Sequence, residues 1–181
     1  TNNAWHVLVS EIMLQQTSVA RVLPKYENFI EEFPTPGHIA RASLGDALTL
    51  WSGLGYPRRC RNLREAAIVI DRDFAGEMPR SLEELLALPG VGQYTARAVL
   101  AFAHREDVAV VDVNVSRVLS RLEGEPLKAR ALQELADQLV PEGLGWDWNQ
   151  VMMDFGARHC TIRHPQCDAC PVKKQCRWHG V

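Results

Sequence analysis

Residues 88–99 read LPGVGQYTARAV, with two glycines two positions apart and a helical pattern that begins at Gln93 or Tyr94. A helix that ends near Leu88, followed by a tight Pro-Gly-x-Gly turn and a second helix, directs free backbone N–H groups outward at a helix N-terminus. Those donors and the helix dipole both favour a bound anion such as a phosphate. A short glycine turn between two helices is also common as plain architecture, so this stretch alone leaves both interpretations open.

Nearly every other segment carries the 3.6-residue hydrophobic period of a helix. The first periodic set consists of Trp5, Leu8, Val9, Ile12 and Met13. Ser81 and Glu84 form a capping box, the motif that begins a helix, and Ser43 with Asp46 is a weaker version of it. Only VAVV, residues 108–111, resembles a strand, and it is too short to build a sheet. The sequence therefore predicts an all-α fold.

The composition allows one large or two small domains, since 46% of the 181 residues are hydrophobic. The formal net charge is −2, whereas a nucleic-acid-binding domain is more often clearly basic. Basic residues nevertheless gather in two places, which are either solvated helix faces or sites of phosphate contact. They are Arg58, Arg59, Arg61 and Arg64, and then Arg158, His159, Arg163, His164, Lys173, Lys174 and Arg177. Without a long apolar run or a secretory leader, we expect no membrane span and a cytoplasmic, nucleoid-associated location.

Four cysteines share the spacing C-x6-C-x2-C-x5-C and are Cys160, Cys167, Cys170 and Cys176. Two disulfides are one interpretation, but nothing in the sequence indicates secretion. Zinc sites usually pair two short knuckles of closely spaced ligands, and only one such pair is present here. A [4Fe–4S] cluster tolerates uneven spacing because four thiolates surround a cube rather than a single ion. The spacing favours this cluster, with zinc as the alternative, and the isolated Cys60 is interpreted as a core residue.

Two carboxylates are candidates for chemistry. Glu11 lies in the otherwise apolar segment VLVSEIMLQQT, where burial raises a pKa toward that of a general acid at neutral pH. The alternative is an exposed glutamate on the polar stripe of that helix. Asp112 follows VAVV and opens the amphipathic segment VNVSRVL, where a helix N-cap is the alternative. One helix and a short return separate Tyr94 from Asp112, which allows both to reach one cleft.

The cysteine spacing resembles that of the endonuclease III and MutY group of DNA glycosylases. LPGVG between two helices resembles the helix-hairpin-helix of the same superfamily. SEIMLQQT, GLGYPRR, VVDVNVSRVL and NQVMMDFGA extend the resemblance, in order, to MutY-type adenine DNA glycosylases over essentially the whole chain. The resemblance implies two helical subdomains and a cluster loop. One subdomain is expected at about 20–125, with the hairpin at 88–93, and the other joins the N-terminal helix to about 126–181.

The resemblance also implies the catalytic residues. Glu11 would protonate adenine and supply or orient water, and Asp112 would stabilise the oxocarbenium-like sugar, with Asn114 and Tyr94 beside it. Bifunctional members of the superfamily carry a lysine at the position of Tyr94, which forms a Schiff base with the sugar. A phenol cannot form an imine, so we expect a monofunctional enzyme that leaves an abasic site.

Further residues are implied by the same resemblance to contact DNA. The hairpin residues Gly90, Val91 and Gly92 would hold a phosphate of the strand that carries the target base. The residues that fill the gap and contact the orphan 8-oxoguanine would be Gln16, Thr17, Leu54 and Tyr56, and an acid near the adenine pocket would be Asp154. Without the resemblance, Leu54 and Tyr56 are interpreted as turn and core residues. The family's separate C-terminal domain, which reads 8-oxoguanine, is expected to be absent.

The sequence thus predicts a monomeric base excision repair glycosylase with a [4Fe–4S] cluster. Its partner would be double-stranded DNA with adenine opposite 8-oxoguanine or guanine. A thymine or uracil mismatch glycosylase is the alternative, because that branch also carries tyrosine at the position of Tyr94, whereas LQQT and GLGY favour adenine. A catalytically silent lesion-binding module is a third hypothesis, which the presence of both Glu11 and Asp112 opposes.

Overall fold

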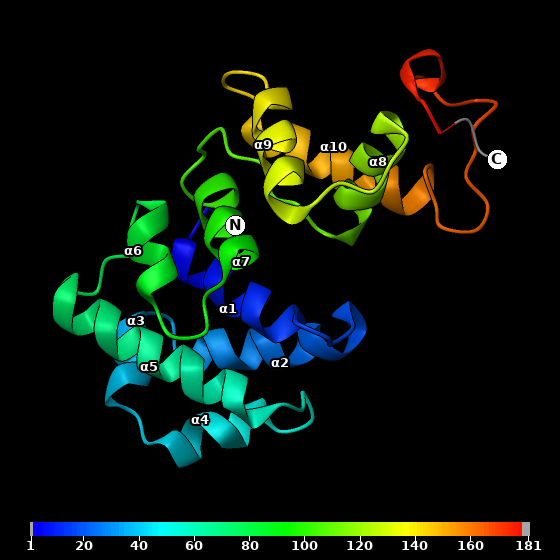
Figure 1. The fold of residues 1–181 in the computed structure, drawn as a ribbon. Coiled ribbons are helices and arrows are strands. Elements are labelled where there is room, and N and C mark those ends of the chain that lie inside the picture. The colour runs from blue at the N-terminus through cyan, green and yellow to red at the C-terminus, as the bar shows by residue number, and fades with distance from the viewer. Residues whose placement is uncertain (1, 179–181) are drawn as a thin grey trace. The chain divides into compact units, whose positions relative to one another are not determined.

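The computed structural model describes residues 2–178. These residues form helices joined by short loops, with no β-strand among them (Figure 1). The predicted all-α class is confirmed. The chain divides into two compact units between His104 and Arg105. The expected assembly of residues 20–125, and of the N-terminal helix with residues 126–181, stays a prediction.

The first unit is built around a buried N-terminal helix. Its helices are α1 (Ala4–Leu14), α2 (Val19–Glu32), α3 (Pro36–Arg41), α4 (Leu44–Trp51), α5 (Pro57–Asp73), α6 (Leu82–Ala87) and α7 (Gln93–Phe102). Helix α1 packs against α2, α5 and α7, which bury its residues on several sides. Asn3 caps its first turn by accepting a hydrogen bond from the His6 N–H, and Trp5 Nε1 donates to the Phe33 carbonyl.

The turns of this unit follow the sequence signals. The capping box at Ser81 and Glu84 is confirmed at the start of α6, with both reciprocal hydrogen bonds present. Ser43 likewise caps α4 by accepting from the Asp46 N–H. Cys60 is fully buried in α5, where burial raises the pKa of its thiol to about 11, as fits a core cysteine.

The second unit contains α8 (Val113–Glu123), α9 (Ala129–Leu139), α10 (Gly145–Arg158) and the short 3₁₀ helix η1 (Lys173–Gln175). Its core includes Val115 and Leu119 of α8 and Leu132 and Ala136 of α9. Helices α8 and α10 approach closely at Gly156, where an added Cβ would lie 2.7 Å from the Asn114 Cβ. Only glycine allows this approach without displacing the helices.

The segment 108–111 is extended but pairs with no strand, because side chains of α9 and α10 take up its backbone groups. Asn149, fully buried in α10, accepts from the Val110 N–H at 2.7 Å and donates to the Val108 carbonyl at 2.9 Å. Asp137 accepts from the Ala109 N–H at 3.0 Å. These bonds hold the segment that leads directly into Asp112.

None of the helices formed by residues 2–178 has the length and apolar character that a membrane crossing requires.

Candidate active site

Glu11 is held in an apolar setting in the last turns of α1. Its neighbours Val9, Ile12 and Met13 are buried, and Glu11 itself is half-buried. Burial raises the pKa of its carboxyl from 4.5 to about 7, while a hydrogen bond with the Tyr94 side chain opposes this rise. The structure therefore brings together two of the predicted catalytic residues. A carboxyl with this pKa carries a proton for donation near neutral pH.

Tyr94 reaches Glu11 because the glycine turn starts α7 immediately before it. Gly90 adopts a left-handed φ of +77°, and an added Cβ would lie 2.7 Å from the Asn62 Cβ, so the turn packs directly on α5. Gly92 is the N-cap of α7 and faces open space, with no atom within 4 Å of an added Cβ. Val91 is buried between them. The turn thus presents the start of a ten-residue helix to its surroundings, as the sequence predicted.

Asp112 is the N-cap of α8, and its carboxylate is also bonded to Asn114. Its Oδ1 accepts from the N–H groups of Asn114 and Val115 at 2.8 and 2.7 Å, and its Oδ2 accepts from Asn114 Nδ2 at 2.9 Å. Asp112 therefore has the helix N-cap role that the sequence analysis gave as the alternative to a role in chemistry. Because each carboxylate oxygen has two acceptor positions, Oδ2 retains capacity for a further partner. Whether this pair meets Glu11 and Tyr94 in one cleft stays a prediction.

Arg117 continues this network toward the cysteine loop. It donates through Nη2 to Asn114 Oδ1 at 2.9 Å and through Nε to the Cys160 carbonyl at 2.8 Å. A second bond from Nη2 reaches the Gly156 carbonyl at 2.5 Å. The sequence analysis did not single out Arg117, since an arginine on an amphipathic helix carries no signal beyond its charge.

The segments that contain Gln16, Thr17, Leu54 and Tyr56 lie side by side at one end of the first unit. Thr17 Oγ1 donates to the Leu54 carbonyl at 3.3 Å, which joins the loop after α1 to the loop before α5. Tyr56 is 57% exposed and Gln16 is exposed, whereas the Leu54 side chain is 2% exposed and belongs to the core. Tyr56 and Gln16 are thus available to a ligand, and Leu54 takes part through its carbonyl. Their contacts with DNA stay predictions.

Asp154 lies on the exposed side of α10, where its carboxylate is 3.8 Å from the Arg158 guanidinium. Both side chains are mostly exposed, so this ion pair contributes little to stability. Its ion pair with Arg158 does not involve another predicted site residue, and its role near an adenine pocket stays a prediction.

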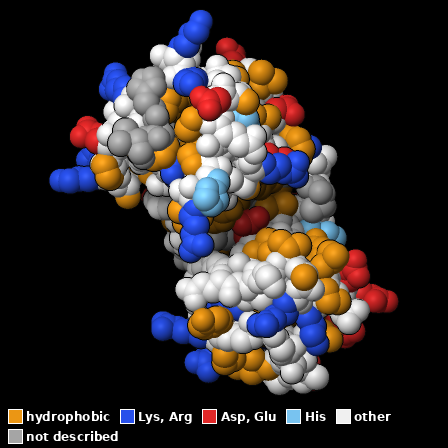
Figure 2. Space-filling view, turned by 90° about the vertical axis from the view of Figure 1, so that its right-hand side faces the viewer, with side chains coloured by type: hydrophobic (Ala, Val, Ile, Leu, Met, Phe, Trp, Pro, Cys, Tyr) orange, Lys and Arg blue, Asp and Glu red, His pale blue; other side chains and the backbone are white. Residues whose placement is uncertain are grey.

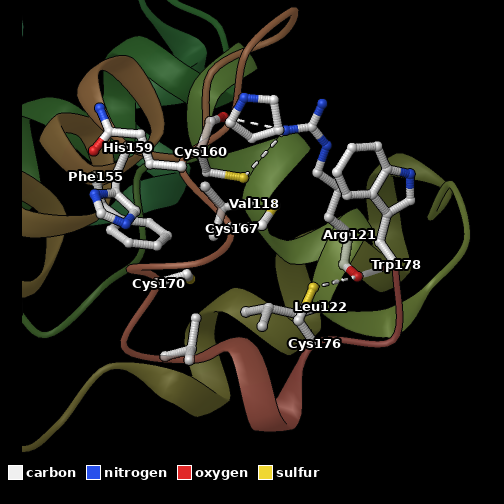
Figure 3. A pocket seen from close by; sticks show the side chains of 13 residues that line it. Val118, Arg121, Leu122, Phe155, His159, Cys160, Cys167, Cys170, Cys176 and Trp178 are labelled. Atoms are coloured by element: carbon white, nitrogen blue, oxygen red, sulfur yellow. Dashed lines mark hydrogen bonds between the residues drawn. The ribbon is translucent and has the colours of Figure 1, made fainter. Parts of the chain in front are cut away.

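The four clustered cysteines line one small cavity of about 30 Å³ that is partly open to solvent (Figure 3). The walls also contain Val118 and Leu122 of α8 and Phe155 of α10. All the cysteines are free thiols, which excludes the two disulfides considered as an alternative. Arg121 donates to Cys160 Sγ at 3.3 Å, and its guanidinium lies 4.0 Å from the ring centroid of Trp178.

Residues 177 and 178 are bonded to α8 beside this cavity, which Trp178 lines. The Arg177 and Trp178 N–H groups donate to the Leu122 and Arg121 carbonyls, both at 3.1 Å. Within residues 2–178, no three His, Cys, Asp or Glu side chains converge closely enough to hold a metal ion.

The face shown in Figure 2 carries its charged side chains in a scattered arrangement. On the face shown in Figure 2, Lys and Arg side chains lie singly or in small groups among hydrophobic and uncharged ones. Two members of the first basic group are directed inward: Arg64 donates to the Ala42 and Ala40 carbonyls, and Arg59 donates to backbone carbonyls of two loops. The Arg59 and Arg64 side chains therefore match neither of the two interpretations of the basic group, a solvated helix face or a site of phosphate contact, because both bond to backbone carbonyls.

Comparison with known proteins agrees with this geometry. Residues 9–142 match the HhH-GPD superfamily of base excision DNA repair proteins. The chain belongs to the HhH-GPD superfamily. Adenine DNA glycosylases of Mycolicibacterium smegmatis and Homo sapiens are each 43% identical to it, over 99% and 96% of its length. The chain spans 62% and 33% of the length of those two relatives.

Solved HhH-GPD-type structures have the same fold. A thermostable thymine-DNA glycosylase is 34% identical and has a TM-score of 0.93, with 99% of this chain and 85% of that chain covered. An endonuclease III–DNA covalent intermediate is 27% identical and has a TM-score of 0.86, with 98% and 84% covered. The helix-hairpin-helix glycosylase fold predicted from the sequence is confirmed.

The pKa of Glu11 predicts a pH-dependent cost of folding. Unfolded Glu11 ionises near pH 4.5, whereas the folded carboxyl keeps its proton until about pH 7, so rising pH lowers the free energy of unfolding across this range. Glu11→Gln removes the cost and should stabilise the protein by about 2 to 3 kcal/mol more at pH 8 than at pH 4. Urea unfolding of both proteins at the two pH values measures this, with exposed Glu27→Gln as the control. An equal effect of Glu11→Gln at both pH values would contradict it.

Substitution of the two hairpin glycines, Gly90 and Gly92, is predicted to affect different properties of the protein. Gly90→Ala combines a left-handed φ with a clash against Asn62 and should lower the free energy of unfolding by about 1 to 3 kcal/mol. At Gly92 the φ is ordinary and an added Cβ would lie in open space, so Gly92→Ala should change the free energy of unfolding by less than about 0.5 kcal/mol. If Gly92 faces a phosphate, its substitution should instead weaken binding of duplex DNA, as measured by fluorescence anisotropy. Equal losses of stability in the two variants would show that this assignment is wrong.

Proposed function

We propose that this protein is a monofunctional DNA glycosylase that hydrolyses the N-glycosidic bond of adenine mispaired with 8-oxoguanine or guanine. The observation that carries the proposal is the buried Glu11 carboxyl, with a pKa of about 7, hydrogen-bonded to Tyr94 at the start of α7. Its identity of 43% to adenine DNA glycosylases over nearly the whole chain supports the same activity.

Glu11 would act as the general acid. Neutral adenine is a poor leaving group, and protonation of its ring weakens the bond to the sugar. A carboxyl that holds its proton up to about pH 7 can perform this step and, once ionised, can orient the attacking water. The adenine would first be extruded from the duplex, which costs about a few kcal/mol of lost stacking and pairing.

Asp112 and Asn114 would stabilise the sugar. Departure of the base leaves positive charge on the sugar ring, and a preorganised carboxylate stabilises that charge. The bonds from the first turn of α8 and from Asn114 Nδ2 fix the Asp112 carboxylate before substrate arrives. A fixed carboxylate needs no reorganisation when the charge develops, which is the physical advantage of placing it at a helix N-cap.

Tyr94 would end the reaction at the abasic site. Its phenol has no amine to condense with the sugar, so no covalent imine forms and water remains the nucleophile. The relative solved as a trapped endonuclease III–DNA covalent intermediate represents the other outcome. In this chain the phenol is bonded to the Glu11 carboxyl, a role that orients the acid.

Double-stranded DNA would be the partner of a monomeric enzyme, and Gly90, Val91 and Gly92 would hold its backbone. The open space at Gly92 and the exposed start of α7 support a phosphate there. Endonuclease III has been solved in complex with DNA in the same fold, which supports this partner. Gln16, Thr17, Leu54 and Tyr56 would meet the opposite base, and Asp154 would lie near the adenine.

Cys160, Cys167, Cys170 and Cys176 would hold a [4Fe–4S] cluster. The residues fit the group because four free thiols line one cavity with apolar walls and a guanidinium that bonds to one sulfur. When bound, the cluster would supply covalent cross-links that hold the loop. Arg163, His164, Lys173 and Lys174 would then be held toward the phosphate backbone of DNA.

A second candidate function is excision of thymine or uracil opposite guanine. The thermostable thymine-DNA glycosylase of known structure, at 34% identity, favours it. The higher identity to adenine DNA glycosylases and the protonated Glu11 favour adenine. A pyrimidine has no purine N7 to protonate and depends less on an acid at this position.

The decisive experiment offers the protein duplexes with A:8-oxoG, A:G, T:G and U:G pairs, followed by alkali. We expect scission only after alkali and only with the adenine duplexes. Glu11→Gln should lower the single-turnover rate by about a hundredfold or more, and the wild-type rate should fall above about pH 7 as the acid ionises. Scission of T:G or U:G alone would establish the second candidate, and scission without alkali would contradict the role of Tyr94. Tight binding without any scission would indicate a lesion-binding module.

Serine substitution tests the cluster ligands. Cys167→Ser should abolish or strongly reduce the iron content and the visible absorbance of the purified protein, whereas Cys60→Ser should leave both unchanged. Elemental analysis for iron, sulfide and zinc distinguishes a cluster from a single zinc ion. A wild-type protein with one zinc per chain and no iron would exclude the cluster.

A further inference from the structure

Arg59, in the first turns of α5, donates its guanidinium hydrogens to the end of α1. Nη1 is 2.9 Å from the Ile12 carbonyl and 3.0 Å from the Met13 carbonyl, and it also donates to the Gln15 carbonyl. The last carbonyls of a helix have no partner within that helix. Arg59 therefore terminates α1 and holds the backbone that follows it.

The same guanidinium holds the loop before α5. Nη2 donates to the Thr17 hydroxyl at 3.0 Å, to the Leu54 carbonyl at 3.0 Å and to the Gly55 carbonyl at 3.3 Å. Thr17 in turn donates to the Leu54 carbonyl. One side chain thus joins two loops that are about forty residues apart in the sequence.

Both loops contain a strained residue. Gln16 has a φ of +57° and Tyr56 a φ of +49°, in the left-handed region that non-glycine residues rarely adopt. Such conformations persist only where surrounding contacts enforce them, and they gather at functional sites. The bonds from Arg59 to the residues on either side of Gln16 and to the two residues before Tyr56 supply that enforcement.

The Tyr56 ring also rests on Arg59. The guanidinium carbon lies 5.1 Å from the Tyr56 ring centroid and 5.7 Å from that of Trp51, within the range of cation–π attraction. Trp51 Nε1 donates to the Gly55 carbonyl at 3.1 Å. The Arg59 guanidinium therefore packs against one face of the exposed Tyr56 ring and helps to fix its orientation.

We propose that Arg59 is a positioning residue that presets Gln15–Thr17 and Leu54–Tyr56 as one surface for the base opposite the excised adenine. The inference rests on the proposed function. It adds a residue that touches no substrate and determines opposite-base preference through the residues it holds. A lysine cannot replace it, because one ammonium cannot direct separate donors at acceptors on two loops as the planar guanidinium does.

The test compares Arg59→Lys with Arg64→Lys. Arg64 lies on the same helix and its guanidinium also bonds to backbone carbonyls, those of Ala42 and Ala40, but it contacts neither loop. Excision is measured under subsaturating single-turnover conditions with A:8-oxoG and A:G duplexes. Arg59→Lys should lower the preference for A:8-oxoG about tenfold, because mispositioned contacts lose discrimination, and should leave the pH midpoint of the rate unchanged. Arg64→Lys should keep the preference.

Hydrogen exchange on the free proteins supplies a readout independent of activity. Amides in residues 15–17 and 54–56 should exchange faster in Arg59→Lys than in the wild type or Arg64→Lys. If Arg59→Lys does not fold, Thr17→Val removes the hydroxyl that bridges Arg59 to the Leu54 carbonyl and should shift preference and exchange in the same direction. An unchanged preference, or an equal loss in the Arg64→Lys control, overturns the role of Arg59. Failure of the wild type to excise adenine would instead overturn the proposed function. This outcome is distinguishable from the others because it is measured on the wild type alone.

Discussion

The burial of one carboxyl group, that of Glu11, is the constraint on which the site depends. Helix α1 is packed against α2, α5 and α7, so a glutamate on it has little access to water. The charged form is disfavoured there, and the pKa rises to about 7. A protein that keeps such a group loses folding free energy as the pH rises from about 4.5 to about 7 and does not regain it at higher pH. The hydrogen bond with Tyr94 recovers part of it and makes the tyrosine that follows the glycine turn part of the acid's environment.

Arginine side chains hold irregular segments within each of the two units. In the first unit Arg59 joins the loop after α1 to the loop before α5, and in the second Arg117 joins Asn114 to the start of the cysteine loop. Both bond to backbone carbonyls that no helix satisfies. A guanidinium suits this task because its five donors lie in one plane and point in fixed directions. The loops that contain Gln16 and Tyr56 can then keep left-handed backbone conformations without regular secondary structure.

The sequence predicted those structural features, such as helix caps, that are formed by residues close together in the chain. The capping box at Ser81 and the N-cap at Asp112 could be predicted because each involves residues no more than three positions apart. The direction of Arg59 and Arg64 was not visible, since a run of arginines has the same pattern whether it faces water or backbone carbonyls. Leu54 illustrates the same limit: its side chain is in the core and its carbonyl joins two loops, whereas the resemblance assigns it to the DNA.

By itself, the sequence determined the all-α class, the helix-hairpin-helix turn, the grouping of four cysteines and the absence of an amine at position 94. Each of these follows from hydrophobic period, glycine placement, ligand spacing or side-chain chemistry, which are properties of the chain itself. Only the packing of the helices shows that Glu11 is partly removed from water, that Tyr94 is its partner and that Arg59 connects two distant loops. Burial and long-range hydrogen bonds depend on which helices pack together, and a single helix's pattern does not specify that.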